Sequence, residues 1–247
     1  NSTMLEIRQG NILNYLKIIS RLSIIKTIYI NFRCLPFHQA CRFPIFIGRN
    51  VHFRNLSGKL IIDTVHVRTG MISFGTKLIF RDDIRTHSYL DIRGNILFKG
   101  KAVFHTGITV VTKSSSELVF GDNYKLGADS MIYVRKKIVF GDNVNISWSF
   151  QILDTDFHYV RSNEDVFNNT KEISIGNYIW IGNHVTIAKG VVLPDYIIVS
   201  SRSHVTKKFK ESRIVVGGIP AKCLALEREC VWNYSDELNC DKLFGNQ

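Results

Sequence analysis

The chain has 247 residues and an apolar content of 45%, which is typical of a globular protein of one or two domains. Its formal net charge of +11 suggests an anionic partner. Nucleic acid, a phosphorylated cofactor and an anionic membrane are the candidate classes. No nucleic-acid-binding motif is recognisable, so we expect no nucleic-acid partner. A solvated basic surface without any partner is an equally good interpretation of the charge.

The cysteines are odd in number and lack C-x-x-C spacing. They are Cys34, Cys41, Cys223, Cys230 and Cys240. Thiols without a pairing pattern favour a reducing compartment, and this spacing does not suit zinc. No secretory signal pattern is recognisable near the start of the sequence. We therefore expect a cytoplasmic protein.

Residues 1–45 predict a helical, basic cap. Apolar residues follow helical spacing at Ile12, Tyr15, Leu16, Ile19 and Leu22. Lys17, Arg21 and Lys26 interrupt them, so the segment is too broken to span a bilayer. Two interpretations stay open. One is a helix packed on the domain or on another subunit, and the other is an interfacial helix that contacts the inner face of an anionic membrane.

Apolar residues then recur at every sixth position, weakly at first and clearly beyond residue 120. Ile47 and Phe74, and the alternation of Ile61, Val65 and Val67, suggest irregular coils. A weak set follows at Phe98, Phe104 and Val110. The clear positions are Phe120, Leu126, Ile132 and Ile138, and, after a slip of two residues, Phe140, Ile146 and Ile152.

The strongest run covers residues 175–205. Its repeating positions are Ile175, Ile181, Ile187, Leu193, Val199 and Val205. A period of six fits neither an amphipathic helix nor an alternating strand. It fits a coil with three flat faces, in which each hexapeptide points one aliphatic residue inward. The sequence therefore predicts an all-β solenoid, a parallel β-helix, over residues 46–222, with residues 223–247 as a C-terminal cap.

The spacing breaks between Ile152 and Ile175, where the sequence is polar. We expect residues 154–172 to form a loop extruded from one coil. Loops on a rigid scaffold often hold binding and catalytic residues. This one contains His158 in the segment Asp154-Thr-Asp156-Phe-His158.

The segments IGNYIWIGNHVTIAKGVVLP (175–194), VTKK (205–208) and GGIPAK (217–222) resemble the hexapeptide-repeat acyltransferases. The likeness is to the maltose and galactoside O-acetyltransferases and to the capsule and lipopolysaccharide O-acetyltransferases. It is strong from about Phe120 to Leu224 and faint before that. The resemblance implies a left-handed β-helix, a homotrimer, and acetyl-CoA bound in a groove between subunits. It also implies direct acetyl transfer to a hydroxyl, with a loop histidine as general base.

By this resemblance His158 is the expected catalytic base, because a neutral imidazole can take a hydroxyl proton at cellular pH. Asp154 or Asp156 would orient the imidazole and stabilise its charged form. Asp154 is alternatively expected to bind the hydroxyls of a sugar acceptor. In the simplest structural interpretation, all three are polar residues of a surface loop.

The resemblance also assigns substrate contacts on the coils. Trp180 is expected at an outward position in the active-site groove, where it would stack on a sugar ring or on the pantetheine arm. Packing between subunits would equally explain an exposed tryptophan at this position. Asn183 and Ser201 match positions whose backbone meets the pantetheine arm. Relatives usually have alanine or glycine at positions 200–202, so Arg202 departs from the family pattern.

A basic stretch after the last regular repeat is expected to meet the phosphates and adenine of CoA. It contains Thr206, Lys207, Lys208 and Lys222. Point-charge lysines suit phosphate recognition, although a solvated charge run is the alternative. Fold relatives of the γ-carbonic anhydrase type bind zinc through three histidines. Here His184 stands alone, so we expect no metal.

Three hypotheses on function follow. The first is acetyl-CoA-dependent O-acetylation of a carbohydrate, with a surface polysaccharide or lipopolysaccharide precursor favoured by the basic charge. No Cys or Ser lies in a nucleophile motif, so we expect direct transfer. The second is N-acylation of an amino or nucleotide sugar on the same scaffold. The third is a catalytically silent β-helix that serves as an assembly module.

Overall fold

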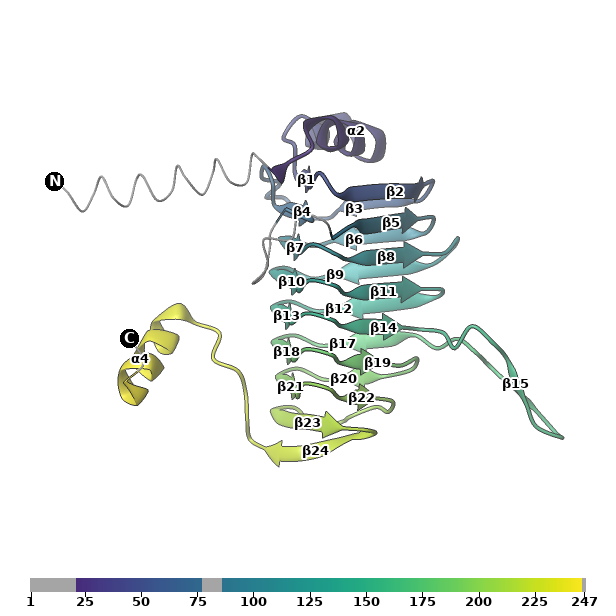
Figure 1. Ribbon diagram of the computed structural model, residues 1–247, viewed down its shortest axis with the longest axis vertical. Coiled ribbons are helices and arrows are strands. Elements are labelled where there is room, and N and C mark those ends of the chain that lie inside the picture. Colours follow the sequence, from purple (N-terminus) through teal and green to yellow (C-terminus); the bar gives the residue numbers. More distant parts are fainter. Residues whose placement is uncertain (1–20, 77–85, 246–247) are drawn as a thin grey trace.

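The computed structural model describes residues 21–76 and 86–245, and within them the chain forms a parallel β-helix of triangular cross-section. Three parallel sheets form the faces of the prism (Figure 1). In Figure 1 the chain crosses the near face from left to right, returns behind, and descends with each coil. This winding is left-handed, against the general preference for right-handed crossovers. It confirms the fold class predicted from the sequence.

The first six coils each contribute one strand to each of three sheets, which we number in chain order, and the later strands extend the first two sheets. The first sheet contains β1 (Ile45–Ile47), β4 (Ile72–Phe74), β7 (Ala102–Phe104), β10 (Tyr124–Leu126), β13 (Val144–Ile146), β18 (Ile179–Ile181), β21 (Ile197–Val199), β23 (Ile214–Gly218) and β24 (Ala221–Leu226). The second contains β2 (Val51–Leu56), β5 (Ser88–Ile92), β8 (Thr109–Thr112), β11 (Met131–Val134), β14 (Gln151–Leu153), β19 (Thr186–Ile187) and β22 (His204–Val205). The third contains β3 (Lys59–Ile62), β6 (Asn95–Phe98), β9 (Glu117–Phe120), β12 (Lys137–Phe140), β17 (Ile173–Ile175) and β20 (Val192–Leu193).

The six-residue rhythm marks the inward positions, as predicted. All of the repeating residues between 175 and 205 are at most 1% exposed. The corners between strands are tight, and their residues adopt positive φ. Asn123 and Asn143 suit this conformation, but Tyr178 and His184 adopt it as well. The coil geometry therefore imposes the left-handed backbone even where the side chain is bulky.

The slip of two residues has a structural cause. Strand β11 of the second sheet points Val134 inward as well as Ile132, whereas its later counterpart β19 ends at Ile187, the residue in register with Ile132 and Ile152. Phe120 pairs with Phe140, a repeat of 20 residues, whereas Ile175 pairs with Leu193, a repeat of 18. The coils before the loop are therefore wider than those after it.

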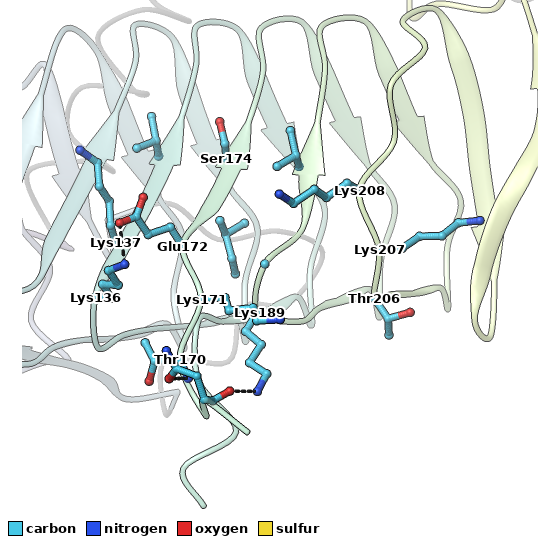
Figure 2. Close-up of a pocket in the computed structure, with 15 residues that line it drawn as sticks. Lys136, Lys137, Thr170, Lys171, Glu172, Ser174, Lys189, Thr206, Lys207 and Lys208 are labelled. Atoms are coloured by element: carbon cyan, nitrogen blue, oxygen red, sulfur yellow. Dashed lines mark hydrogen bonds and ion pairs between the residues drawn. The ribbon is translucent and has the colours of Figure 1, made fainter. Parts of the chain in front are cut away.

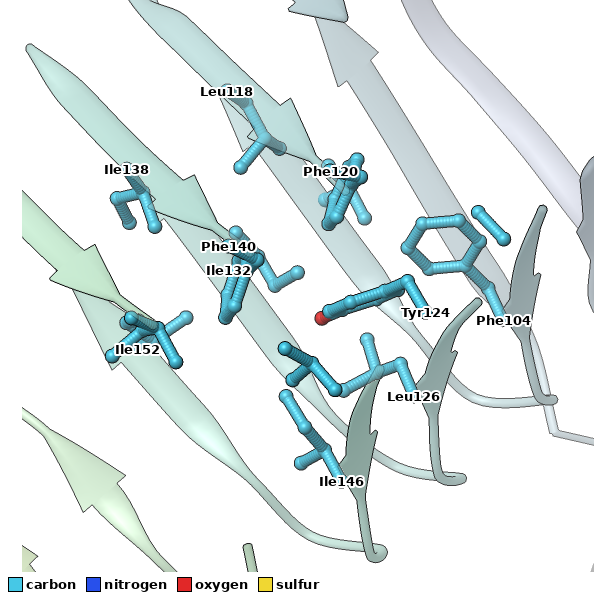
Figure 3. Packing of buried hydrophobic residues seen from close by; sticks show 14 of the residues in the cluster. Phe104, Leu118, Phe120, Tyr124, Leu126, Ile132, Ile138, Phe140, Ile146 and Ile152 are labelled. Carbon is cyan, nitrogen blue, oxygen red and sulfur yellow. The ribbon is translucent and has the colours of Figure 1, made fainter. Parts of the chain in front are cut away.

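Aromatic rings fill the wider coils. Phe98 stacks on Phe120 at 5.3 Å between ring centroids, and Phe120 stacks on Phe140 at 5.6 Å. Tyr124 lies beside this ladder and is fully buried (Figure 3), and its hydroxyl has no hydrogen-bond partner among the described residues. Burial raises the pKa of the Tyr124 phenol well above its ordinary value, because the charged form would lose its hydration.

The first coils are more regular than predicted. Ile47 and Phe74 lie in paired strands and are buried. The predicted alternation of Ile61, Val65 and Val67 is wrong as an inward pattern, because Ile61 and Val65 are exposed. Leu60 and Ile62 point inward instead.

Both ends of the prism are covered. Helices α2 (Ile24–Cys34) and α3 (Phe37–Ala40) lie over β1, whereas β23 and β24 form an antiparallel hairpin at the other end. Helix α4 (Tyr234–Phe244) follows this hairpin (Figure 1). Most of the amphipathic pattern predicted in the N-terminal segment, from Ile12 to Ile19, lies outside the described residues. In the described part of the chain, no helix combines the length and the hydropathy needed to cross a bilayer.

Candidate functional site

A groove of about 790 Å³ lies at the edge between the second and third sheets. Figure 2 shows its lining side chains, which come from four coils and from the returning end of the 154–172 loop. The lining residues are Lys136, Lys137, Val139, Asn168, Thr170, Lys171, Glu172, Ile173, Ser174, Lys189, Gly190, Val192, Thr206, Lys207 and Lys208. The groove therefore collects six lysines and one carboxylate.

Three of the six lysines are paired with carboxylates. Lys136 pairs with Glu172 at 3.0 Å, Lys137 pairs with Glu117 at 2.8 Å, and Lys189 pairs with Asp156. Within the described chain, the other three lysines have no ion pair: Lys171, Lys207 and Lys208. The Lys207 ammonium lies 5.3 Å from the centroid of the Phe209 ring. These three cations give the groove an uncompensated positive charge that suits an anionic ligand.

Asp154 anchors the beginning of the loop. Its side chain is fully buried, and its two carboxylate oxygens accept hydrogen bonds from the backbone N–H groups of residues 135–137 at 2.7–2.9 Å. Its carbonyl oxygen accepts the N–H of Lys171 at 3.0 Å. Asp154 thus joins both ends of the loop to the corner that carries Lys136 and Lys137. This geometry favours an anchor over the expected contact with a sugar or with His158.

Beyond this anchor, hydrogen bonds and a ring contact hold the first residues of the loop in place. The Asp156 N–H donates to the Asn169 carbonyl at 2.8 Å, and the Asn169 amide donates to the Phe157 carbonyl at 3.2 Å. Phe157 adopts a φ of 63° and packs edge-on against Tyr133 at 4.8 Å between ring centroids. A positive φ is strained for phenylalanine and marks a position that the surrounding contacts impose. This position immediately precedes His158.

His158 is exposed on the loop. Its backbone N–H donates to the Asp156 carbonyl at 2.7 Å, and its imidazole has no hydrogen-bond partner in the described chain. The Asp156 carboxylate is held by Lys189, and Lys189 also donates to the Asn168 carbonyl at 2.7 Å. The two carboxylates expected to orient His158 therefore contact other groups.

The rest of the loop projects from the prism as a hairpin of β15 (Val160–Arg161) and β16 (Val166–Phe167) (Figure 1). Its apolar side chains do not reach the core. The exposed ones are Phe157, Tyr159, Val160, Val166 and Phe167. The sequence located this loop but gave no indication of its apolar surface.

The structure divides the predicted substrate residues between two edges of the prism. Thr206, Lys207 and Lys208 line the groove at the edge between the second and third sheets. Asn183 and Ser201 lie at the edge between the first and second sheets, where the Asn183 carbonyl accepts the N–H of Arg202 at 2.9 Å. Their separation means that the predicted set does not come together within one protomer.

Two further predicted residues lie outside the groove. Trp180 points outward from β18 with 41% of its surface exposed, as the hexad spacing predicted. Lys222 lies on β24 in the terminal hairpin and is exposed. His184 occupies a corner, and the described residues contain no group of three side chains suited to hold a metal.

Four groove lysines were missed by the sequence analysis: Lys136, Lys137, Lys171 and Lys189. The run Arg135-Lys136-Lys137 at a predicted corner was an available signal. The other two lysines lie 34 and 52 residues beyond Lys137 and become its neighbours only through the stacking of coils.

No family model matches the chain. It is 27% identical over 229 residues to an uncharacterized 24.8 kDa protein in the cps region of Klebsiella pneumoniae, covering 88% of this chain and 98% of that protein. It is 30% identical to the galactoside O-acetyltransferase of Escherichia coli over 44% of this chain and 54% of that enzyme. It is 31% identical to the polysialic acid O-acetyltransferase of Neisseria meningitidis over 42% of this chain and 50% of that enzyme. The matched segments thus span about half the length of the two named enzymes.

Among solved structures, the polySia-specific acetyltransferase NeuO aligns over 83% of this chain and 88% of its own, with 18% identity and a TM-score of 0.46. A mutant of AntD, an N-acyltransferase from Bacillus cereus in complex with dTDP and coenzyme A, aligns over 81% of this chain and 89% of its own, with 16% identity and a TM-score of 0.45. The hexad rhythm and the left-handed triangular coil agree with the resemblance to the hexapeptide-repeat acyltransferases, and the matched segments show that this chain is similar to two O-acetyltransferases over less than half of its length.

Proposed function

We propose that this protein transfers the acetyl group of acetyl-CoA to a hydroxyl of a carbohydrate, with His158 as general base. The observation that carries the proposal is the position of the loop. The exposed imidazole lies on the loop whose returning end lines the lysine-rich groove, and Asp154 fixes the beginning of this loop. This arrangement brings a base and an anion-binding surface to one edge of the prism.

The groove suits the phosphates of CoA. Lys171, Lys207 and Lys208 supply cations that no carboxylate neutralises among the described residues. Lysine ammonium groups bind phosphate as point charges, and a partly enclosed groove weakens their screening by water. Thr206 adds a hydroxyl beside them. In this proposal Asn183 and Ser201 contact the pantetheine arm, and Lys222 contacts the adenine end.

The chemical step follows from the state of the His158 imidazole. The neutral ring accepts the proton of the acceptor hydroxyl as its oxygen attacks the thioester carbon. The C–S bond then breaks, and the thiolate of CoA takes the proton from the imidazolium. No covalent intermediate on the protein is needed. Because Asp154 and Asp156 are engaged within the protomer, the group that orients His158 comes from the acceptor or from a neighbouring subunit.

A homotrimer would complete this site. The groove and the Trp180, Asn183 and Ser201 positions lie on different edges of the prism. Prisms packed side by side would place one edge of a protomer against a different edge of its neighbour. The apolar side chains exposed on the β15–β16 hairpin would gain a surface to pack against in such an assembly.

We infer that the acceptor is a glycan of a surface polysaccharide or of a lipopolysaccharide precursor. The support comes from the matched segments, because one relative is named a polysialic acid O-acetyltransferase and another a protein in the cps region. The exposed Trp180 supports a sugar ligand, because a flat indole can stack on a pyranose ring.

The test is an acetyl-transfer assay with oligosaccharides that offer hydroxyl groups only, and with matched amino sugars. The expected product gains the mass of one acetyl group and loses it in mild alkali, as an ester does. An alkali-stable product formed only from amino sugars would replace the proposal with N-acylation. If calorimetry detected no binding of CoA at millimolar concentration, the enzymatic proposal would fail and an assembly role would be favoured.

A further inference from the structure

The N-terminal end of the prism has an apolar outer surface, which is unusual for a capping helix. Helix α2 points two polar side chains, Thr27 and Asn31, inward. The Asn31 amide donates to the Ile45 carbonyl at 2.7 Å and accepts the Ile45 N–H at 3.1 Å, and the Thr27 hydroxyl accepts the Ile47 N–H at 3.1 Å. These bonds satisfy the backbone of β1, which would otherwise be an open edge of the first sheet.

The opposite side of α2 is therefore apolar and faces away from the prism. Ile25 is 82% exposed, and Ile28, Tyr29 and Phe32 continue the same stripe at helical spacing. Phe37 of α3 is 74% exposed, and its ring lies 6.1 Å from that of Phe32. We call these five residues the cap patch. Figure 1 shows α2 at the extreme end of the prism, with no other labelled element above it.

The net charge of the chain is concentrated at this same end. Among the described residues, 21–62 contain seven Lys or Arg and no Asp or Glu, so they supply +7 of the total of +11. Arg33, Arg42, Arg49 and Arg54 are exposed, and none of them forms an ion pair in the described chain. Exposed apolar side chains and unpaired cations in the same part of a protein are the combination that binds the interface of an anionic membrane.

We propose that the cap patch docks this protein on the surface of an anionic lipid bilayer, with the prism standing away from it. The charge distribution favours this occupant over a second copy of the chain, because two such basic surfaces would repel each other. Four inter-strand steps separate β1 from β13, whose coil gives rise to the catalytic loop. At about 4.8 Å a step, the loop lies about 20 Å from the membrane.

Vesicle flotation of the full chain tests this docking. We expect the protein to float with phosphatidylcholine vesicles that contain phosphatidylglycerol, and not with phosphatidylcholine alone. Ile25→Glu with Phe37→Glu should weaken binding about tenfold or more, because both buried apolar surface and charge attraction are lost. The matched control is Leu224→Glu with Leu226→Glu, two exposed leucines at the other end of the prism. It adds the same charge and should bind as the parent does.

Several results would overturn the proposal. They are equal binding to neutral and anionic vesicles, equal binding of the two double variants, and no binding at all. A change in the oligomeric state of the Ile25 and Phe37 variant, without vesicle binding by the parent, would assign the patch to a protein interface. A large fall in its melting temperature would show that another part of the chain covers the patch. Acetyl transfer to a soluble acceptor should be unchanged in this variant, so the docking and the enzymatic proposals can fail separately.

Discussion

The coils before the loop and the coils after it fill the interior of the prism with different side chains. The earlier coils are wider and are filled by stacked aromatic rings, from Phe74 to Phe140. The later coils repeat every 18 residues and contain aliphatic residues only at their inward hexad positions. The 154–172 loop projects from the prism where the wider coils meet the narrower ones. Residues from both the wider and the narrower coils line the groove.

Regular pairing of the coils does not require a regular six-residue spacing in the sequence. The later coils show the hexad because each of their faces takes six residues, with one inward residue at the hexad position and another two residues before it. The earlier coils are as well paired, but strands of the second sheet such as β11 point a further residue, Val134, inward beyond the hexad position, so the repeat lengthens by two residues and the simple spacing is lost. A solenoid tolerates this because each coil contacts mainly its neighbours, so the cross-section can change gradually along the axis.

The largest expected effect concerns the aromatic ladder. Phe120→Ala should lower the free energy of unfolding by about 3–5 kcal/mol, because it leaves a cavity between two stacked rings. Ile187→Val in the aliphatic coils should lower it by only about 0.5–1.5 kcal/mol. Urea denaturation followed by circular dichroism measures both. A loss below about 1 kcal/mol for Phe120→Ala would show that the wide coils can collapse around a missing ring.

The second effect concerns activity and leaves the fold intact. His158→Ala should reduce kcat by about 10²- to 10⁴-fold with an unchanged melting temperature, because the exposed imidazole makes no contact that stabilises the protomer. His66→Ala, at an exposed histidine of the earlier coils, is the control and should retain parental activity. Near-parental turnover of the His158 variant would remove the proposed base.

The third effect concerns donor binding in the later coils. Lys207→Ala with Lys208→Ala should weaken CoA affinity by about tenfold and reduce the dependence of that affinity on salt. The control, Lys59→Ala with Lys99→Ala, removes the same charge from exposed lysines outside the groove. Isothermal calorimetry at two salt concentrations measures both variants. Equal affinities would reject the phosphate contact.

The smallest effect tests the apolar character of the wide coils. Tyr124→Phe should raise the free energy of unfolding by about 1 kcal/mol, because it removes a buried hydroxyl that has no partner. The raised pKa of the phenol agrees with this environment, since burial disfavours the charged form. A destabilised Tyr124→Phe variant would show that the hydroxyl has a hydrogen-bond partner in solution, such as a buried water.

The candidate site was partly predictable. The break in spacing located the loop, and the resemblance to the acyltransferases singled out His158 within it, which the structure leaves exposed. The assignment of Asp154 as a sugar or imidazole contact could not anticipate its burial, because the three N–H groups that surround its carboxylate belong to the preceding coil. The inverted polarity of α2 was equally hidden, since only the position of β1 explains why Thr27 and Asn31 face inward.

The sequence by itself determined the inward residues of the coils, the position of the loop and the resemblance to the hexapeptide-repeat acyltransferases. These depend on local spacing, in which the residue at each hexad position is buried. The tertiary structure decided which lysines meet in the groove, which edge of the prism each predicted residue occupies, and what the capping helix presents to solvent. These depend on the stacking of coils, which brings residues one coil or more apart in sequence to about 5 Å in space.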